Sequence, residues 1–506
     1  METLSALPWW IWFIAILILL GIKDVFFNRK HTIKHNFPVV GHIRYLLEKI
    51  GPEIRQYIVA NNREELPFNR SERSWIYASS KRENNYEGFG TDKDIHSPNF
   101  HFIKPQIFPF RVQKGHPNES EPDFLPVAKV IGGYHNRKKP FRPKSAINIG
   151  AMSYGSLSAK AVEAMNIGSL KSACIHNTGE GGLSVHHSQG ADVIFQIGTG
   201  YFGVRDEDGY FSFDKAEKIA ENNSFVKAFE IKLSQGAKPG KGGVLPASKI
   251  SAEIAEIRHI PKGQAALSPH YHSAFSNVDE LLEFIEELSK RTGLPVGIKS
   301  AVGKLEYWHE LAKKMKERNL GPDYIAIDGG EGGTGAAPPS FADHVSLPFF
   351  YAFSSVYRVF QEYGMEKNIV WVGSGKLGLP AKAIKAMALG VDMIYVAREA
   401  MMSIGCIQAQ VCHTNRCPAG VATQNKWLQN GIHVPEKSDR LAQYMKTFRK
   451  EVIELTHAAG YEHPCEFNTC DIDISMGDSN TTQTMENCFG YSKTPVEFSG
   501  MHTLKE

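Results

Sequence analysis

The sequence predicts an α/β protein built on a (β/α)8 (TIM) barrel, with an apolar helix before the barrel and a cysteine-rich loop after its last strand. Three observations favour this fold. Short aliphatic runs alternate with helical segments over about 250 residues, Gly-rich turns follow most of these runs, and three cysteines lie within one late loop. A doubly wound open sheet is the alternative, but no G-x-G-x-x-G motif follows the first run.

Length and composition fit one barrel-sized domain with extensions. The chain has 506 residues, of which 42% are hydrophobic and 22% charged, and its formal net charge is +3. Basic residues are spread along the chain without interleaved aromatic residues, so nucleic-acid binding is not expected. We expect a transmembrane anchor at 1–30, an extension packing on the barrel at 31–140, the barrel at 141–425, and a C-terminal helical extension and tail at 426–506.

An apolar run at residues 7–22 lies near the N-terminus. If two charged side chains snorkel, it extends to residue 27, close to the ~20 residues that cross a bilayer. Its outer end carries three tryptophans: Trp9, Trp10 and Trp12. Basic residues follow the run and none precedes it, which predicts a single pass through the cell membrane with the rest of the chain in the cytoplasm. The alternatives are a buried core helix and a cleaved signal peptide, which Glu2 disfavours.

Eight strands are expected, with helical segments such as 279–290 and 381–389 between them. They lie at 146–149, 173–176, 228–233, 265–268, 296–300, 324–328, 369–373 and 393–397. Active sites of such barrels gather on the loops after the C-terminal ends of the strands. The motifs fall there: 151–153 after the first strand, 177–182 after the second, 235–238 after the third, residue 300 at the fifth and 329–335 after the sixth.

Two Gly-rich loops, at 328–335 and 373–375, can each turn several backbone N–H groups toward one anion. Such nests suit a single phosphate better than a pyrophosphate, so FMN is preferred over NAD or FAD. A tight turn without a ligand is the alternative for either loop. Lys299, at the end of the fifth strand, would stabilise negative charge at the N1/C2=O edge of a flavin, or pair with an acid such as Asp328 inside the barrel.

The loop at 405–424 carries three cysteines spaced C-x5-C-x4-C, and a proline follows the last one. Three thiolates suit a three-iron cluster, or a four-iron cluster with one labile corner. One alternative is a zinc ion held by these cysteines and His413, and another is three buried thiols without a metal. The spacing of the remaining cysteines assigns no role to Cys465, Cys470 or Cys488. The role of the C-terminal tail is also open.

Five motifs occur in the order found in the FMN-binding domain of glutamate synthases: GAMSYGS at 150–156, NTGEGG at 177–182, QGAKPG at 235–240, GGTGA at 332–336 and the cysteine loop. The sequence resembles this family over roughly residues 130–460. The resemblance implies a [3Fe-4S] cluster held by Cys406, Cys412 and Cys417 next to FMN. The cofactor-binding residues that it implies are Ala151, Met152, Ser153, Asn177, Gln235, Lys299, Gly332, Gly333, Thr334, Gly373, Gly375, Ala397 and Arg398.

The resemblance also implies substrate and catalytic residues. Positions matching Lys232, Lys238 and Arg258 hold 2-oxoglutarate in glutamate synthases, although such residues are by themselves more often solvated surface charges. Glu180, expected to be catalytic together with Lys299, would relay a proton, position ammonia or an imine, or cap the following turn. Three residues depart from the family pattern and make the substrate less well predicted than the cofactors: Tyr201, Lys241 and Val244.

The activity implied is that of an FMN-dependent oxidoreductase acting on CH–NH2 groups. Electrons would pass from the cluster to FMN and reduce an imine such as 2-iminoglutarate to glutamate. The alternatives are an amine-oxidising or N-methylglutamate synthase-like enzyme, and an electron-transfer subunit that needs an amidotransferase partner. No cysteine precedes Cys174 and no Rossmann fingerprint is found, so ammonia and electrons are expected from elsewhere, for example from a ferredoxin-like protein.

Overall fold

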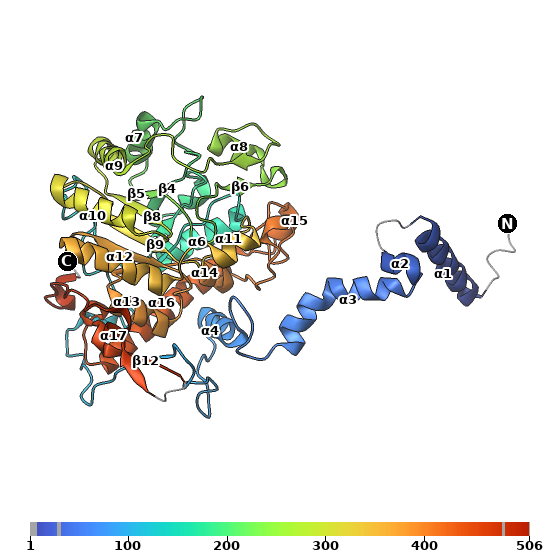
Figure 1. Ribbon diagram of the computed structural model, residues 1–506, viewed down its shortest axis with the longest axis horizontal. Helices are drawn as coiled ribbons and strands as arrows, with labels where there is room; N and C mark the ends of the chain where they lie inside the picture. The colour runs from blue at the N-terminus through green and yellow to red at the C-terminus, as the bar shows by residue number, and fades with distance from the viewer. Residues whose placement is uncertain (1–7, 28–31, 478–480, 505–506) are drawn as a thin grey trace. The chain divides into compact units, whose positions relative to one another are not determined.

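The computed structural model describes residues 8–27, 32–477 and 481–504. Its contacts divide the chain into two units, Met1–Ser71 and Glu72–Glu506, which Figure 1 colours along the sequence. The helix α4 (Arg70–Lys81) begins at the boundary between them.

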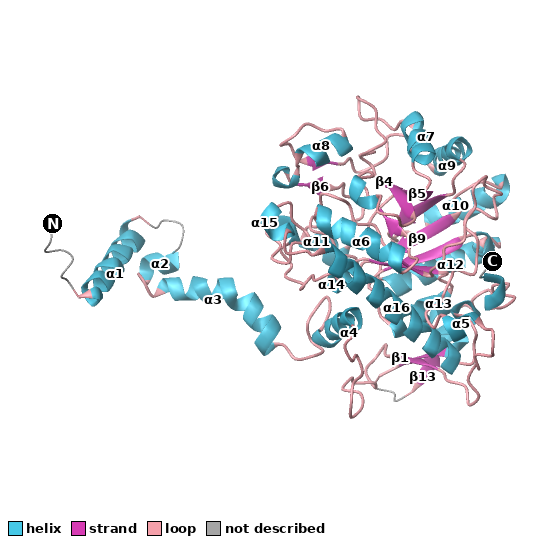
Figure 2. Cartoon of the chain, turned by 180° about the vertical axis from the view of Figure 1, so that it is seen from behind, coloured by secondary structure: helices cyan, strands magenta, loops and turns pink. Residues whose placement is uncertain are grey.

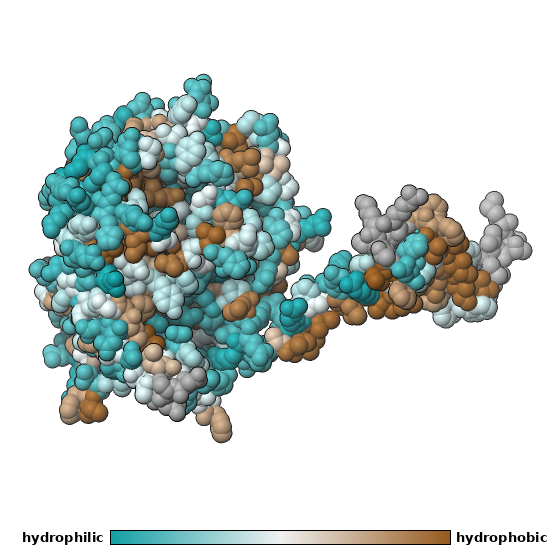
Figure 3. Space-filling model, in the orientation of Figure 1, coloured by the Kyte–Doolittle hydropathy of each residue, from teal (hydrophilic) through white to brown (hydrophobic). Residues whose placement is uncertain are grey.

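The first unit is helical. It contains α1 (Trp9–Phe26), α2 (Thr32–Asn36), α3 (Gly41–Ile54) and a π-helical turn (Arg55–Val59). Apolar side chains of α1 and α3 are exposed (Figure 3). The buried Asp24 joins the two helices, because its carboxylate accepts a hydrogen bond from the Val39 amide at 3.1 Å and lies 2.9 Å from Nε2 of His42. Among the described helices only α1 is long and apolar enough to span a membrane, a test that a signal sequence also passes.

The second unit is built on a closed barrel of eight parallel strands, as the sequence predicts (Figure 2). In chain order the strands are β2 (Ile147–Ile149), β3 (His176–Asn177), β4 (Val193–Ile197), β5 (Val226–Lys232), β8 (Val296–Ser300), β9 (Tyr324–Asp328), β10 (Val370–Ser374) and β11 (Met393–Val396). All these strands are almost completely buried, which is typical of parallel strands covered by helices.

One expected strand is wrong and one strand was not expected. Residues 265–268 do not join the barrel: β7 (Ala266–Leu267) pairs antiparallel with β6 (Val244–Leu245) in a two-stranded sheet within the loop after β5. The barrel's third strand is β4, which was missed because only a 3-10 turn (Val185–His187) separates it from β3. The motif at 235–238 therefore follows the fourth strand rather than the third.

Helices cover the outside of the barrel. They include α6 (Ala159–Lys171), α7 (Phe213–Asn222), α9 (Val278–Thr292), α10 (Glu306–Arg318), α12 (Phe349–Tyr363), α13 (Pro380–Leu389), α14 (Arg398–Ser403) and α16 (Val434–Ala458). Local signals set their ends: the Asn277 side chain accepts a hydrogen bond from the Glu280 amide to cap α9, and Gly293 ends that helix in the left-handed region. Outside the barrel, β1 (His101–Ile103), β12 (Ile472–Ser475) and β13 (Thr482–Thr484) form a small sheet.

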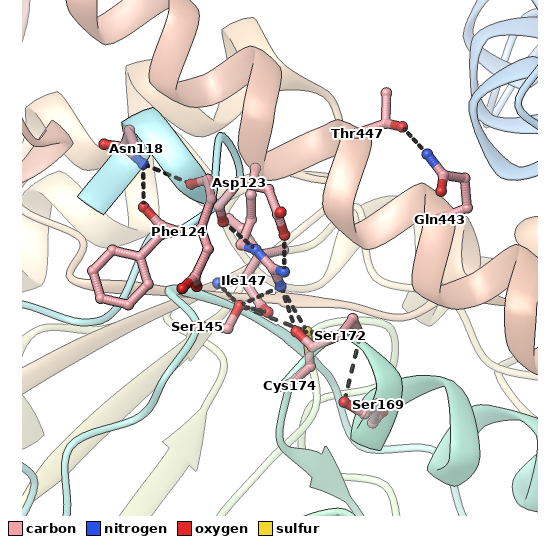
Figure 4. A network of polar contacts seen from close by, with 12 residues as sticks. Asn118, Asp123, Phe124, Ser145, Ile147, Ser169, Ser172, Cys174, Gln443 and Thr447 are labelled. Carbon is pink, nitrogen blue, oxygen red and sulfur yellow. Dashed lines mark hydrogen bonds and ion pairs between the residues drawn. The ribbon is translucent and has the colours of Figure 1, made fainter. Parts of the chain in front are cut away.

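The helix α16 packs against α6, α13 and α14 outside the barrel, and its Arg449 reaches the segments that lead into β2 and β3. The buried guanidinium of Arg449 donates hydrogen bonds to the Ser172 carbonyl at 2.8 Å, to Cys174 Sγ at 3.2 Å and to Ser145 Oγ at 3.2 Å. It also donates to the Asp123 carbonyl at 2.9 Å (Figure 4). These contacts lie where the strands begin and serve stability, since the chemistry of barrel proteins lies at the opposite face.

Candidate active site

The loops that follow the strands carry the predicted motifs to one end of the barrel. A hollow there has an empty volume of about 310 Å³, counting space open to solvent. Its lining comes from the end of β5 and from the loops after β3, β4, β5 and β7: Glu180, Thr199, Lys232, Leu233, Ser234, Gln235, Gly240, Lys241, Gly242, Gly243, Pro269 and His270. Glu180, Lys232 and Gln235 were predicted at the site from sequence, whereas Thr199 and His270 were not, because no motif marks them.

Glu180 and Lys232 form the central ion pair of this hollow. The Lys232 ammonium lies 3.0 Å from Glu180 Oε1, and it donates a hydrogen bond to Gln235 Oε1 at 3.1 Å. Burial by itself raises the pKa of Glu180, but Lys232, Lys238 and Arg258 outweigh it and lower that pKa to about 2. Glu180 is therefore a carboxylate at neutral pH and has no proton to give.

The other two predicted substrate cations are buried beside this pair. Lys238 is 3% exposed, and its ammonium donates a long hydrogen bond of 3.3 Å to the Gly242 carbonyl. Arg258 lies in α8 (Ala252–Arg258), donates to the Tyr154 carbonyl at 3.0 Å and stacks over the Phe202 ring at 5.0 Å. Burial lowers the pKa of Arg258 to about 10, and Glu180 acts in the opposite direction. The structure thus brings all three predicted cations around one carboxylate.

Lys299 lies one strand away from Lys232, in direct register with it on the neighbouring strand β8. Its buried ammonium is 3.7 Å from Asp328 Oδ2, which is an ion pair but too long for a hydrogen bond. The Asp328 carboxylate is already satisfied, because it accepts hydrogen bonds from the Gly236 amide at 2.9 Å and from Ser374 Oγ at 2.7 Å. The pairing with Asp328 that the sequence left open is therefore present, but loose.

The loop after β3 touches the loop after β2 closely, and the loop after β5 touches the loop after β9. A Cβ on Gly179 would lie 2.5 Å from the Ser153 amide nitrogen, and one on Gly236 would lie 2.0 Å from the Gly329 carbonyl oxygen. These glycines are therefore needed for the loops to meet. Met152 is buried beside Ala151, and Ser153 Oγ donates to Ser156 Oγ at 2.9 Å.

Asn177 points into the barrel interior rather than only toward the mouth. Its side-chain amide donates to Glu230 Oε1 at 2.9 Å, and its carbonyl oxygen accepts from the Gly179 amide at 3.0 Å. The fully buried Glu230 also accepts hydrogen bonds from Gln196 at 2.6 Å and from the Tyr395 hydroxyl at 3.0 Å. The sequence does not predict a role for Glu230, because nothing in the pattern around it shows that Asn177, Gln196 and Tyr395 donate hydrogen bonds to it.

The Gly-rich loops after β9 and β10 and the turn into α14 after β11 lie at adjacent strand ends. Arg398 donates a short hydrogen bond to the Glu331 carbonyl, and a Cβ on Gly333 would lie 3.1 Å from the Arg398 side chain. A Cβ on Gly332 would have its nearest neighbour 3.2 Å away. Thr334 is exposed, and Ala397 immediately precedes α14. On the neighbouring strand end, Gly373 and Gly375 pack against the Phe349 ring.

The three loop cysteines are near one another and near the Gly-rich loop. Cys417 is buried, Cys406 and Cys412 are half-buried, and burial followed by the charges of the other two thiols raises the pKa of Cys406 to about 12. A Cβ on Gly335 would lie 3.3 Å from Cys412. Among the described residues no three His, Cys, Asp or Glu side chains converge on one metal ion, and His413 is exposed.

A cluster makes a different demand on these thiols, because each would bind its own iron and the sulfurs need not converge on one point. The donor set of three thiols in one loop fits that demand. A buried lysine that the sequence did not reveal fixes the loop: Lys249 donates to the carbonyls of Cys412 at 2.9 Å, Ala422 at 3.0 Å and Ser156 at 3.2 Å. On another side, the Tyr77 hydroxyl donates to the Cys406 carbonyl at 2.8 Å.

The three residues that depart from the family pattern lie in different places. Lys241 lines the hollow. Tyr201 does not: it is buried, and its hydroxyl accepts a hydrogen bond from the Ala274 amide at 3.1 Å. Val244 is 40% exposed within β6. Only Lys241 is thus in a position to meet a ligand in the hollow.

Comparison with known proteins places this site in a family. The family model described as the conserved region in glutamate synthase matches residues 110–462, which lie within the second unit. The chain belongs to the glutamate synthase family. As a member, it is an oxidoreductase of the glutamate synthase kind, the class that acts on CH–NH2 groups.

Individual glutamate synthase relatives differ in how much of their length is matched. The glutamate synthase large subunit-like protein YerD of Bacillus subtilis (strain 168) is 40% identical, over 87% of this chain and 89% of that protein. The archaeal glutamate synthase [NADPH] of Methanocaldococcus jannaschii is 34% identical over 68% of this chain and 66% of that protein. The archaeal-type glutamate synthase [NADPH] of Thermotoga sp. (strain RQ2) is 35% identical over 61% of this chain and 58% of that protein. A mandelate oxidase crystal structure with (S)-4-hydroxymandelic acid has a TM-score of 0.43 and 14% identity, over 82% of this chain and 91% of that one.

Proposed function

We propose that this protein reduces the imine of a 2-oxo acid, such as 2-iminoglutarate, to the amino acid. The 2-oxo acid and ammonia condense with loss of water, and addition of a hydride to Cα and a proton to nitrogen then gives the amine. The observation that carries the proposal is the excess of positive charge around Glu180. Three cations, Lys232, Lys238 and Arg258, act on this one carboxylate, which leaves two positive charges for a dicarboxylate to neutralise.

Glu180 would act on the nitrogen of the substrate. A carboxylate with a pKa of about 2 attracts ammonium or a protonated imine by charge, but it does not serve as a proton donor at neutral pH. Its pairing with Lys232 holds it in place, and Gly198 and Gly243 leave space for it, since a Cβ on either would lie within 2.8 Å of it. We infer a positioning role rather than a proton relay.

The chain's residues fit two cofactors known for the family, FMN and a [3Fe-4S] cluster. When bound, the flavin would supply the hydride and the cluster would pass single electrons. The flavin phosphate would be held by the loops after β9, β10 and β11: Gly332, Gly333, Thr334, Gly373, Gly375, Ala397 and Arg398. Ala151, Met152, Ser153, Asn177 and Gln235 would hold the ring side, with the loosely paired Lys299 as the cation beside it. Cys406, Cys412 and Cys417 would ligate the cluster.

Localisation and partners form part of the proposal. The apolar α1 would anchor the chain in the cell membrane by a single pass, with the barrel in the cytoplasm. Electrons would come from a ferredoxin-like protein or another donor, and ammonia from solution or from an amidotransferase partner. Exposed tryptophans at the start of α1 support the anchor, since tryptophan favours the membrane interface.

The test is an anaerobic titration of the full chain in detergent. We expect flavin absorbance, iron and acid-labile sulfide in the purified protein, and an electron paramagnetic resonance signal near g = 2, as is typical of an oxidised three-iron cluster. Reduced flavin should be reoxidised by 2-oxoglutarate together with ammonium, and by neither alone. Protein without flavin, or reduced flavin that the pair leaves unchanged, would refute the proposal.

A further inference from the structure

The helix α3 exposes one continuous apolar face. Its apolar residues recur with helical spacing, so they lie on one side of the helix. They are between 37% and 57% exposed, although such residues are usually buried when a helix packs on a core. We call the set the α3 face, and it consists of Ile43, Leu46, Leu47, Ile50 and Ile54. Apolar surface runs along this unit in Figure 3, and a contiguous surface of this kind marks an interaction site.

Charged residues occupy the rest of the circumference of α3. With 3.6 residues per turn, Arg44 and Lys49 each lie roughly 60° beyond one edge of the α3 face, and Glu48 lies on the far side. All three side chains are exposed. Between residues 34 and 55 the sequence has four Lys or Arg and two Glu, so the helix region carries an excess of positive charge.

Asp24 holds the start of α3 at the C-terminal end of α1. Its buried carboxylate accepts a hydrogen bond from the Val39 amide at 3.1 Å and lies 2.9 Å from Nε2 of His42. Earlier in α1, Gly21 packs against the chain just before α3, since a Cβ on it would lie 3.9 Å from both Pro38 and Val39. A bilayer that α1 crosses would therefore have the first turn of α3 at its surface.

An apolar face held at the surface of a bilayer is covered most directly by the bilayer itself. Amphipathic helices in such a place bury their apolar side about 5–10 Å into the boundary between headgroups and acyl chains. Lys and Arg at the edges of the face then reach anionic headgroups. We propose that α3 lies along the membrane surface, with the α3 face in the lipid and Glu48 toward water. This inference rests on the proposed membrane span of α1, and not on the proposed activity.

Power-saturation electron paramagnetic resonance at room temperature tests the proposal on the full chain in vesicles of phosphatidylcholine and phosphatidylglycerol. A nitroxide label is placed on the α3 face by Leu47→Cys or Ile50→Cys, and on the opposite side by Glu48→Cys, the matched control. The exposed Cys470 and Cys488 are first replaced by serine so that they are not labelled. Oxygen concentrates in lipid and a nickel chelate stays in water. A label in the bilayer therefore meets oxygen, a label in water meets nickel, and a label in a protein interface meets neither.

We expect the ratio of oxygen to nickel accessibility to be severalfold higher at positions 47 and 50 than at position 48, with the flavin content of wild type. Equal ratios at the three positions would overturn the inference. Low accessibility of positions 47 and 50 to both reagents would overturn it as well, and would indicate a second copy of the chain or another protein on the α3 face.

A further label at Ile18→Cys, an exposed position within α1, separates failure of the anchor from failure of the inference. Oxygen accessibility at position 18 without it at positions 47 and 50 overturns only the placement of α3. Nickel accessibility at all these positions overturns the anchor and the inference together. Failure of the proposed activity leaves every label reading unchanged, and appears only as reduced flavin that 2-oxoglutarate with ammonium does not reoxidise.

Discussion

Replacing Glu180 by glutamine tests the charge arrangement of the site most directly. The substitution keeps the shape of the side chain but removes the partner that Lys232 contacts at 3.0 Å. The pKa of Glu180 falls from its usual 4.5 to about 2 on folding, a difference worth about 3 kcal/mol at most. Since the side chain is 20% exposed, solvent screening reduces this, and we expect a loss of about 1–3 kcal/mol at pH 7.

The pH dependence follows from the sign of the shift. A lowered pKa stabilises the folded state above pH 4.5, and this contribution disappears as pH falls from 4.5 toward 2. Thermal unfolding of the detergent-solubilised chain should therefore show a lower Tm for Glu180→Gln than for wild type at pH 7, and convergence of the two only as the pH approaches 2. The variant should also bind glutarate at least as tightly as wild type while losing turnover. Equal Tm values at pH 7 would refute the reasoning.

Three further outcomes are expected. Arg449→Met should lower the free energy of unfolding by about 2–4 kcal/mol in denaturant titrations, because the buried Ser172 carbonyl and the half-buried Asp123 carboxylate lose their donor. Arg440→Met should change it by less than ~1 kcal/mol, because Arg440 is half-buried and pairs with the exposed Glu436; similar values for both would contradict this. Tyr77→Phe removes one hydrogen bond of about 1 kcal/mol from the cysteine loop and should speed iron loss to a chelator about fivefold, with flavin content unchanged. Lys299→Met should lower the flavin midpoint potential by roughly 30–60 mV in redox titrations, and an unchanged potential with flavin bound would exclude its electrostatic role.

The barrel could be predicted from sequence because its strands are fully buried apolar runs that alternate with helices. Where that alternation fails, the prediction fails as well. The β3–β4 connection has a 3-10 turn instead of a helix, so the pattern does not predict β4 as a separate strand. The sequence predicts residues 265–268 as the missing eighth strand, and they lie outside the barrel. These apolar residues pair with β6 in a small antiparallel sheet, where Leu267 is 65% exposed, so they do not mark a strand buried in the barrel.

The candidate site was predictable to the level of which loops meet, but not to the level of which charges pair. Motif order placed Glu180, Lys232 and Lys238 at one end of the barrel, because the carboxyl ends of parallel strands share an edge. The sequence does not predict roles for Glu230 and Lys249, because their partners lie far away in sequence. Glu230 accepts hydrogen bonds from Gln196 and Tyr395, and Lys249 donates to carbonyls of the cysteine loop. Pair identities depend on three-dimensional distances that no spacing encodes.

The two lysines at neighbouring strand ends show why the site can treat two anions differently. Lys232 and Lys299 are opposite each other on β5 and β8, so their like charges must be compensated. Lys232 lies 3.0 Å from Glu180, a full ion pair, whereas Lys299 is 3.7 Å from Asp328, whose carboxylate is engaged by other donors. The charge of Lys299 is therefore only partly neutralised and is available to an anionic group beside β8. An anion in the hollow would instead meet Lys241, which lines it, so we expect the two anions not to compete for one cation.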